Sequence, residues 1–346
     1  MAGGGCFSLV AFLDGRLRRT FVAAGLDRAT LQVDNETTIH CWVPSGGRGR
    51  KPALLLLHGF GPTPTWQWHH QVAALSPHLD LYVPELVFFG ESTTTSPERS
   101  EVFQAECMAR LMRKLAVDRF CVAGTSYGGF VAYHVARLYP EMVERVIIAS
   151  SAVNRRAGDD GEFLKKAGAD DVVDVLLPRT ADGLRSLLKL VFYRPPFFLP
   201  NFLSNDFIHT LFTEGRREKL QLLKAITLGK EGRCNLTPLP QEVLIMWGKF
   251  DQVFPLEKAY DLQKLIGENV KLEIMDKTSH VPQMEQPGKF NGVVLQFLLQ
   301  ARSDFHLDGL EKKKNGHDDN RSTTKNAFPS VEINAGTPAS YVAGNV

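Results

Sequence analysis

Gly124-Thr125-Ser126-Tyr127-Gly128-Gly129 is the stretch that decides the fold of this 346-residue chain. It matches G-x-S-x-G, with a short apolar run at 120–123 before it and a helical pattern at 130–138 after it. In such a strand-to-helix turn the serine hydroxyl projects above the sheet edge, and side chains at the first and last glycine of the pentapeptide would collide with backbone. The following helix directs amide groups at a developing oxyanion. We therefore predict that Ser126 is a nucleophile.

Apolar, β-branched runs alternate with helical patterns on both sides of this motif. The predicted strands are residues 29–33, 38–43, 53–57, 79–83, 120–123, 143–149, 243–247 and 270–275. The predicted helices are residues 66–75, 102–115, 130–138, 256–266 and 290–299. This alternation predicts an α/β fold with a mainly parallel sheet and helices on both faces.

Three segments depart from the alternation. Residues 155–240 are helical in pattern and rich in phenylalanine, so we interpret them as a helical insertion between two late strands of a core formed by 29–154 and 241–301. Residues 1–28 are an N-terminal segment with a predicted amphipathic helix, which either packs on the domain or lies on a membrane surface. Residues 302–346 are polar and are predicted to be disordered, because they bury too little apolar surface to offset their ordering entropy.

Composition excludes several classes of protein. The net charge of +2 gives no reason to expect a nucleic-acid partner. The five cysteines are dispersed, which favours reduced thiols in an intracellular protein. No apolar run approaches the ~20 residues of a membrane span, and no signal peptide is recognised. We expect a cytoplasmic protein, with peripheral membrane contact through the N-terminus as the alternative.

A base and an acid should follow Ser126 in the chain order Ser, Asp, His, because a serine hydroxyl needs a base to become nucleophilic. His280 fits as the base, since it lies in the loop after strand 270–275. Asp251 fits as the acid that orients His280, since it follows strand 243–247. Asp276 is a rival that lies closer to His280 in the sequence, and we interpret it as a hydrogen-bond acceptor within its loop.

An oxyanion hole needs two backbone N–H groups near the nucleophile. Tyr127, the residue after Ser126, is one candidate donor. Phe60 is the other, because it lies in the loop His58-Gly59-Phe60-Gly61 after the aliphatic strand 53–57. We expect no metal and no cofactor: the adjacent His69 and His70 cannot both face one ion, and no G-x-G-x-x-G pattern precedes a helix.

The same motifs, together with the segment 84–92, resemble the α/β-hydrolase family in their usual order, over about residues 34–299. The Gly-Thr-Ser-x-Gly-Gly elbow is most similar to the plant branch akin to monoacylglycerol lipases. The resemblance implies a helical lid between the sixth and seventh core strands, and ester hydrolysis without a cofactor. One departure is Glu85–Gly90, where many relatives have an Asp and an Arg before the glycine. We assign Glu85 a structural role.

The expected function is that of a serine esterase or lipase, acting on a lipophilic ester such as a monoacylglycerol. Family members resembling epoxide hydrolases use an aspartate nucleophile, and Ser126 occupies that position here. Two alternatives stay open, because both keep the same triad: a hydrolase-like receptor for a small molecule, such as a strigolactone or karrikin, and a hydrolase of carbon–carbon bonds. The phenylalanines of the insertion line a lipophilic pocket or pack between lid and core.

Overall fold

The computed structural model describes residues 8–300 except 47–48, 50, 157 and 231–235. The predicted disorder of 302–346 therefore lies outside the described residues, as do Cys6 and Cys234. The strands are β1 (Leu26–Gln32), β2 (Thr37–Pro44), β3 (Ala53–Leu57), β4 (Asp80–Pro84), β5 (Thr93–Thr94), β6 (Phe120–Thr125), β7 (Val143–Ala149), β8 (Glu242–Gly248) and β9 (Val270–Met275). The helices are α1 (Leu9–Ala23), α2 (Pro64–Leu75), α3 (Glu101–Lys114), α4 (Tyr127–Leu138), α5 (Asp159–Ala167), α6 (Val172–Leu176), α7 (Ala181–Val191), α8 (Asn201–Leu211), α9 (Arg216–Ala225), α10 (Glu257–Ile266), α11 (Pro282–Glu285) and α12 (Pro287–Leu299).

The strands form one sheet in the order β1-β2-β4-β3-β6-β7-β8-β9, with β5 paired to β2. From β4 to β9 all neighbouring pairs are parallel, whereas β2 pairs antiparallel with β1 and β4. The predicted mainly parallel sheet is confirmed. The chain moves to opposite sides of β3 when it enters β4 and β6, so the carboxyl ends of β3 and β6 form a switch point, where ligands bind in such sheets.

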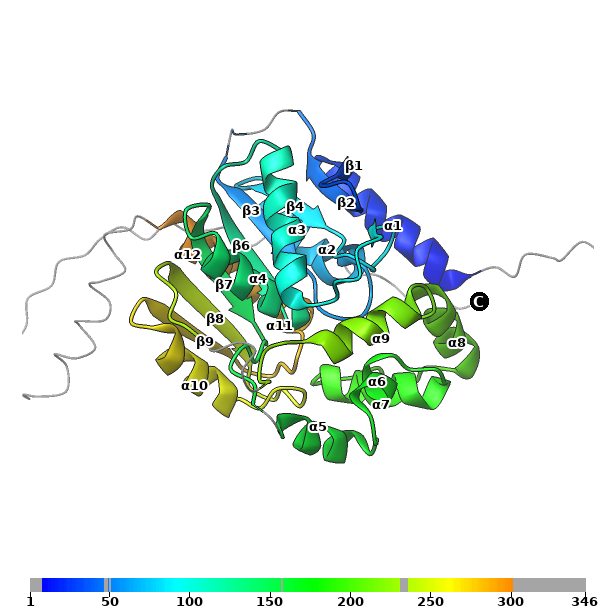
Figure 1. The fold of residues 1–346 in the computed structure, drawn as a ribbon. Helices are drawn as coiled ribbons and strands as arrows, with labels where there is room; N and C mark the ends of the chain where they lie inside the picture. Colours follow the sequence, from blue (N-terminus) through cyan, green and yellow to red (C-terminus); the bar gives the residue numbers. More distant parts are fainter. Residues whose placement is uncertain (1–7, 47–48, 50, 157, 231–235, 301–346) are drawn as a thin grey trace, which may run out of the picture. The chain divides into compact units, whose positions relative to one another are not determined.

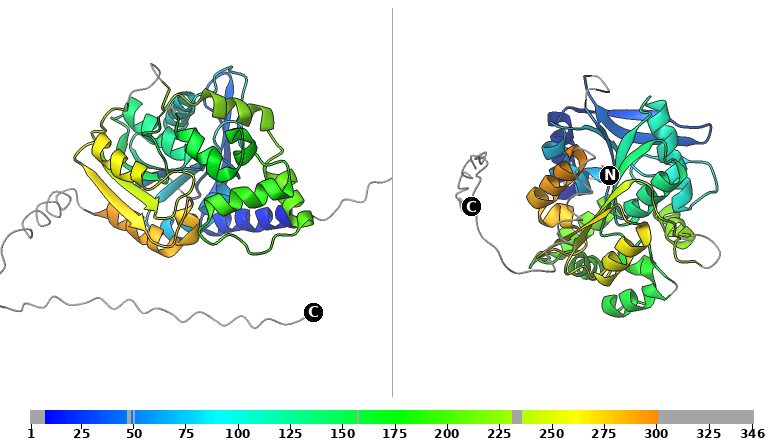
Figure 2. Two further views of the ribbon diagram at one scale, coloured as in Figure 1. Left: turned by 90° about the horizontal axis from the view of Figure 1, so that it is seen from below. Right: turned by 90° about the vertical axis from the view of Figure 1, so that its left-hand side faces the viewer.

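Helices cover both faces of the sheet (Figures 1 and 2). On one face α3 and α4 pack against each other, and on the other α2 contacts α11 and α12. The central strands β3 and β6 are buried along almost their whole length, as expected for strands covered on both faces. This burial gives the loops at their carboxyl ends a rigid base.

Most predicted boundaries lie within three residues of the observed ones, and two differences have a clear cause. Helix α4 begins at Tyr127 rather than at residue 130, although Gly128 and Gly129 are poor helix formers. Tertiary packing outweighs the low helix propensity of glycine there, because a side chain at Gly128 would collide with the backbone of β3. Strand β1 begins at Leu26 rather than 29, because it pairs with β2 over its whole length.

In the described part of the segment between β7 and β8, where we predicted a helical insertion, the chain forms the five helices α5 to α9. Their apolar side chains form a hydrophobic cluster to which Val10 of α1 also belongs. Helix α1 contacts α2 and α8, and its Val10 and Phe21 are fully buried. In the part of the chain that the structure describes, no helix combines the length and the apolar character needed to cross a bilayer.

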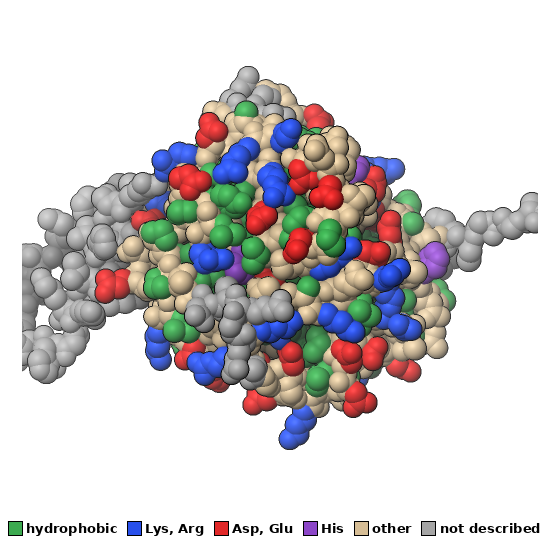
Figure 3. Space-filling view, viewed as in Figure 1, with side chains coloured by type: hydrophobic (Ala, Val, Ile, Leu, Met, Phe, Trp, Pro, Cys, Tyr) green, Lys and Arg blue, Asp and Glu red, His purple; other side chains and the backbone are tan. Residues whose placement is uncertain are grey.

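The face shown in Figure 3 carries basic and acidic side chains side by side. Hydrophobic groups are scattered between them rather than gathered in one place. This mixture agrees with the small net charge of the chain.

Candidate active site

Ser126 lies at a sharp turn between β6 and α4. Its φ of 52° is in the left-handed region, which is uncommon for a residue with a side chain. A Cβ at Gly124 would lie 2.1 Å from the Gly128 carbonyl oxygen, and one at Gly128 would lie 2.3 Å from the Leu57 carbonyl oxygen. The collisions predicted from the motif are therefore present, and they hold the turn tightly against β3.

His280 reaches Ser126 from the loop after β9. Its Nε2 lies 2.8 Å from the Ser126 Oγ, within hydrogen-bond distance, although 154 residues separate the two in the chain. Both side chains line the same cavity. The structure thus brings the predicted nucleophile and the predicted base together.

Asp251 holds the other side of the His280 ring. His280 Nδ1 lies 2.9 Å from Asp251 Oδ2 and 3.1 Å from Oδ1, and the Asp251 side chain is inaccessible to solvent. The backbone N–H groups of Val253 and Phe254 both donate to Asp251 Oδ1 at 2.9 Å. The rival Asp276 has a side chain that is 73% exposed and pairs with Lys249, so it is not near the ring nitrogen as an orienting acid must be.

The two predicted oxyanion donors, Phe60 and Tyr127, line the same cavity as Ser126. Their rings pack edge to face with centroids 6.1 Å apart. Among the described residues, no backbone carbonyl accepts a hydrogen bond from either amide N–H. Both donors are therefore free for a ligand, as an oxyanion hole requires.

Gln67 of α2 fixes the loop that carries Phe60. Its Nε2 donates to the carbonyl oxygens of Gly59 at 3.0 Å and Pro62 at 2.7 Å, and its Oε1 accepts from the Gly59 N–H at 2.8 Å. The sequence analysis missed this residue. A lone glutamine in a helix carries no motif, so only the tertiary contact identifies it.

The loop that carries His280 is joined to the end of α7. The Ser279 Oγ donates to the Leu190 carbonyl at 2.9 Å, and the His280 N–H donates to the Val191 carbonyl at 3.0 Å. Glu285 bridges the same two segments, because its carboxylate accepts from the backbone N–H groups of Ser279 and Tyr193. Burial raises the pKa of Glu285, while these hydrogen bonds oppose that rise. The position of His280 therefore depends on the insertion as well as on the sheet.

The cavity above Ser126 has a volume of about 1110 Å³. The site residues Phe60, Ser126, Tyr127 and His280 line it, and most of the other lining residues come from the insertion. Aliphatic and aromatic side chains of the insertion that line it include Phe163, Val173, Leu184, Leu187, Leu188, Leu211 and Phe212. Charged side chains of both signs, among them Asp159, Glu162, Lys166 and Lys224, also line it.

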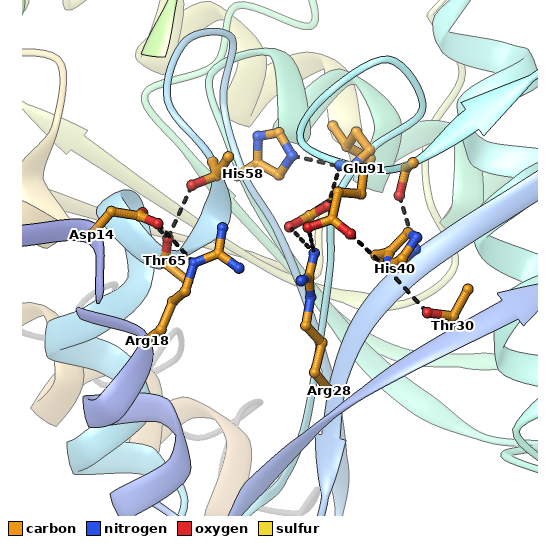
Figure 4. Close-up of polar contacts among 12 residues, drawn as sticks. Asp14, Arg18, Arg28, Thr30, His40, His58, Thr65 and Glu91 are labelled. Carbon is orange, nitrogen blue, oxygen red and sulfur yellow. Dashed lines mark hydrogen bonds and ion pairs between the residues drawn. The ribbon is translucent and has the colours of Figure 1, made fainter. Parts of the chain in front are cut away.

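Polar contacts behind the oxyanion loop fix its position (Figure 4). His58 Nε2 accepts from the Leu86 N–H at 3.0 Å, and burial lowers the pKa of His58 to about 4, so its ring is neutral at pH 7. Nearby, Arg28 pairs with Glu91 at 2.7 Å and lies 3.4 Å from Glu85. The Glu85 carboxylate also accepts from the Glu91 N–H, so its contacts hold the turn at Gly90.

Within the described residues, no three His, Cys, Asp or Glu side chains gather as a metal ion would require.

Comparison with known proteins identifies the family of this chain. A model described as alpha/beta hydrolase fold matches residues 52–287, which include all five predicted site residues.

The individual relatives are distant but cover most of the chain. Monoacylglycerol lipase ABHD6 of Homo sapiens is 26% identical, over 78% of this chain and 82% of that protein. Epoxide hydrolase 4 of Mus musculus is 25% identical, over 75% and 76%. Among solved structures, a bacterial membrane phospholipase A matches with a TM-score of 0.69 and 25% identity, over 84% of this chain and 92% of that one.

Proposed function

This chain belongs to the α/β-hydrolase fold family, and from that premise we propose that it is a serine hydrolase of lipophilic carboxylic esters. The observation that carries the proposal is the continuous hydrogen-bonded line from Asp251 through His280 to Ser126 at the polar end of an apolar cavity. A nucleophile, a base in contact with it and an acid that orients the base are the parts that acyl transfer needs.

The chemistry follows from the geometry. Asp251 accepts a hydrogen bond from the protonated Nδ1 of His280. Nε2 of the same ring is then unprotonated, so it can take the proton of Ser126. The serine oxygen attacks the ester carbonyl, and the N–H groups of Phe60 and Tyr127 stabilise the oxyanion. His280 then gives its proton to the departing alcohol, leaving an acyl group on Ser126. Water activated by His280 releases the acid and restores the serine.

The walls of the cavity favour a substrate with a long apolar group. A cavity of about 1110 Å³ lined by aliphatic and aromatic side chains matches an acyl chain better than a small polar ester. A monoacylglycerol is the substrate that we propose, and human ABHD6, a relative by sequence, is named for that activity. The Gly-Thr-Ser-x-Gly-Gly elbow remains our reason for placing the chain beside the plant branch of the family.

The relative named an epoxide hydrolase does not change this proposal. The residue at the elbow here is a serine, and a serine attacking an ester forms an acyl-enzyme that water can hydrolyse. We therefore expect ester hydrolysis rather than epoxide opening.

Labelling with a fluorophosphonate tests the nucleophile. The wild-type protein should be labelled, and Ser126→Ala should not be labelled although it remains folded. A panel of glycerol and p-nitrophenyl esters of increasing acyl length then tests the cavity, with faster turnover expected for long chains. Absence of labelling in folded wild-type protein would contradict the proposal. Slow single turnover with capture of a partner would indicate the receptor alternative, and turnover of a vinylogous diketone without ester cleavage would indicate the carbon–carbon hydrolase.

A further inference from the structure

The link between α7 and α8, together with the first turn of α8, exposes three phenylalanines. The side chains of Phe197, Phe198 and Phe202 are 106%, 78% and 73% exposed, more than the other large hydrophobic residues of the described chain. Single exposed hydrophobic residues are common, but three strongly exposed phenylalanines within six positions are not. We call these three residues the phenylalanine patch.

This segment is held in place rather than loosely attached. The guanidinium of Arg185 on α7 donates to the Leu199 carbonyl at 3.0 and 2.8 Å, and it also contacts the side chain of Asn201. Prolines at 195, 196 and 200 further restrict the backbone. The phenylalanine rings therefore point outward because the backbone is fixed in that arrangement.

The charged residues around the patch in the sequence are mainly basic. Between residues 183 and 205 the charged side chains are Arg185, Lys189 and Arg194, all basic. The flanking acids are already engaged: Asp182 pairs with Arg185, and Asp206 accepts hydrogen bonds from the Ser8 hydroxyl and the Val10 N–H. Exposed aromatic groups beside basic side chains are typical of surfaces that bind anionic lipid membranes.

The same segment also forms part of the cavity wall. Pro196 and Leu199 line the cavity that contains Ser126, whereas the three phenylalanines are not among its lining residues. A lipid surface that contacts the patch would thus lie at a wall of the apolar cavity. We choose a lipid surface over a protein partner as the occupant because a bilayer would present the lipophilic substrate of the proposed function at this wall.

We propose that the phenylalanine patch inserts into the headgroup region of an anionic lipid bilayer, with Lys189 and Arg194 contacting lipid phosphates. This surface differs from the N-terminal helix, for which membrane contact was one of the two alternatives that the sequence left open. Helix α1 turns Val10 and Phe21 into the protein and packs against α2 and α8.

Vesicle flotation tests the proposal without any turnover, so its outcome is independent of the proposed catalytic function. The full chain should float with vesicles of phosphatidylcholine and phosphatidylserine, and more weakly with phosphatidylcholine alone. The triple variant Phe197→Ser/Phe198→Ser/Phe202→Ser should bind the mixed vesicles roughly a hundredfold more weakly. Its hydrolysis of a soluble short-chain ester should be unchanged, since the three residues do not line the cavity.

Matched variants separate the patch from other surfaces. Tyr260→Ser/Leu265→Ser removes two hydrophobic residues of α10 that are each 45% exposed, and it should bind as the wild type does. Lys189→Glu/Arg194→Glu should weaken binding to the mixed vesicles only. The proposal is overturned if the wild type floats with neither vesicle, or if the triple variant floats as well as the wild type.

Two further outcomes would also overturn it. Loss of flotation in Phe12→Ser, with full flotation of the triple variant, would assign membrane contact to α1. A wild-type dimer in solution that the triple variant converts to a monomer would assign the patch to a second copy of the chain.

Discussion

At the carboxyl edge of the sheet, the side chains of Gln67, Asp251 and His280 each make two or more hydrogen bonds, whereas α5 to α9 line the same cavity largely with apolar groups. In the mechanism that we propose, the first region moves protons and must keep fixed distances. The apolar side chains of the second region make no directional hydrogen bonds, so they select a substrate by its size and shape. The difference indicates that substitutions at the sheet edge should lower turnover of every substrate, and that substitutions in the insertion should change which substrate is used.

The strongest test of this contrast compares two aspartates. Asp251→Asn should lower kcat for all esters by about 10⁴-fold, because the amide leaves the His280 ring with the wrong tautomer. Asp276→Asn should stay within about twofold of the wild type, since its partner Lys249 is on the surface. Steady-state kinetics on one short and one long ester measures both. Equal losses in the two variants would remove Asp251 from the site.

A smaller effect is expected at the oxyanion loop. Gln67→Leu removes three hydrogen bonds from that loop and should lower kcat roughly a hundredfold with little change in KM. Gln71→Leu is the matched control, because Gln71 is a buried glutamine of the same helix whose side chain bonds to Gln283 and Asn291 instead. The control should lower the melting temperature but not kcat. If both variants lose kcat equally, Gln67 acts only on stability.

The buried His58 predicts a pH dependence of stability rather than of substrate choice. Burial lowers the pKa of His58 from 6.5 to about 4, so the unfolded chain binds a proton in this window that the folded chain does not. The free energy of unfolding should therefore fall as the pH falls from 6.5 to 4, by up to about 3 kcal/mol from this group. His58→Gln should lack that part of the fall, and the exposed His209→Gln should retain it. Denaturant titrations across this pH range provide the measurement.

The smallest effect is expected in the insertion, where selectivity should change without loss of chemistry. Leu188→Trp fills part of the cavity and should lower kcat/KM for long-chain esters about tenfold, with little effect on an acetate ester. Ser186→Trp places the same side chain on an exposed position of α7 and should behave as the wild type does. A loss of acetate hydrolysis in Leu188→Trp would show that the insertion acts on the chemistry as well.

The sheet was predictable because its signals are local. Runs such as Ala53–Leu57 and Val143–Ala149 carry continuous apolar, strand-forming residues, and both strands have the predicted bounds. The elbow was predictable because only glycine avoids the contacts at Gly124 and Gly128. Ser126, His280 and Asp251 were found by chain order, and the structure brings them within hydrogen-bond distance. Their catalytic roles remain our proposal.

Other parts of the site had no local signal. Gln67 holds the Phe60 loop through three hydrogen bonds, and Glu285 bridges two segments through two. No motif in the sequence around either residue indicates these contacts. In the sequence, only the order of residues along the chain favoured Asp251 over Asp276. The structure distinguishes them, because the Asp251 side chain is buried against His280 and the Asp276 side chain is exposed. The outward direction of Phe197 depends on an arginine twelve positions away, which fixes the backbone of the loop.

The sequence by itself determined the alternating elements, the glycine-constrained turn at Ser126 and the residue types available for acid–base chemistry, because each depends on sterics within a few neighbouring residues. Only the tertiary structure decided which side chains meet, which phenylalanines face water and how the insertion supports the His280 loop. Hydrogen bonds and apolar contacts act over a few ångströms, and the residues that they join here lie as far as 221 positions apart in the chain.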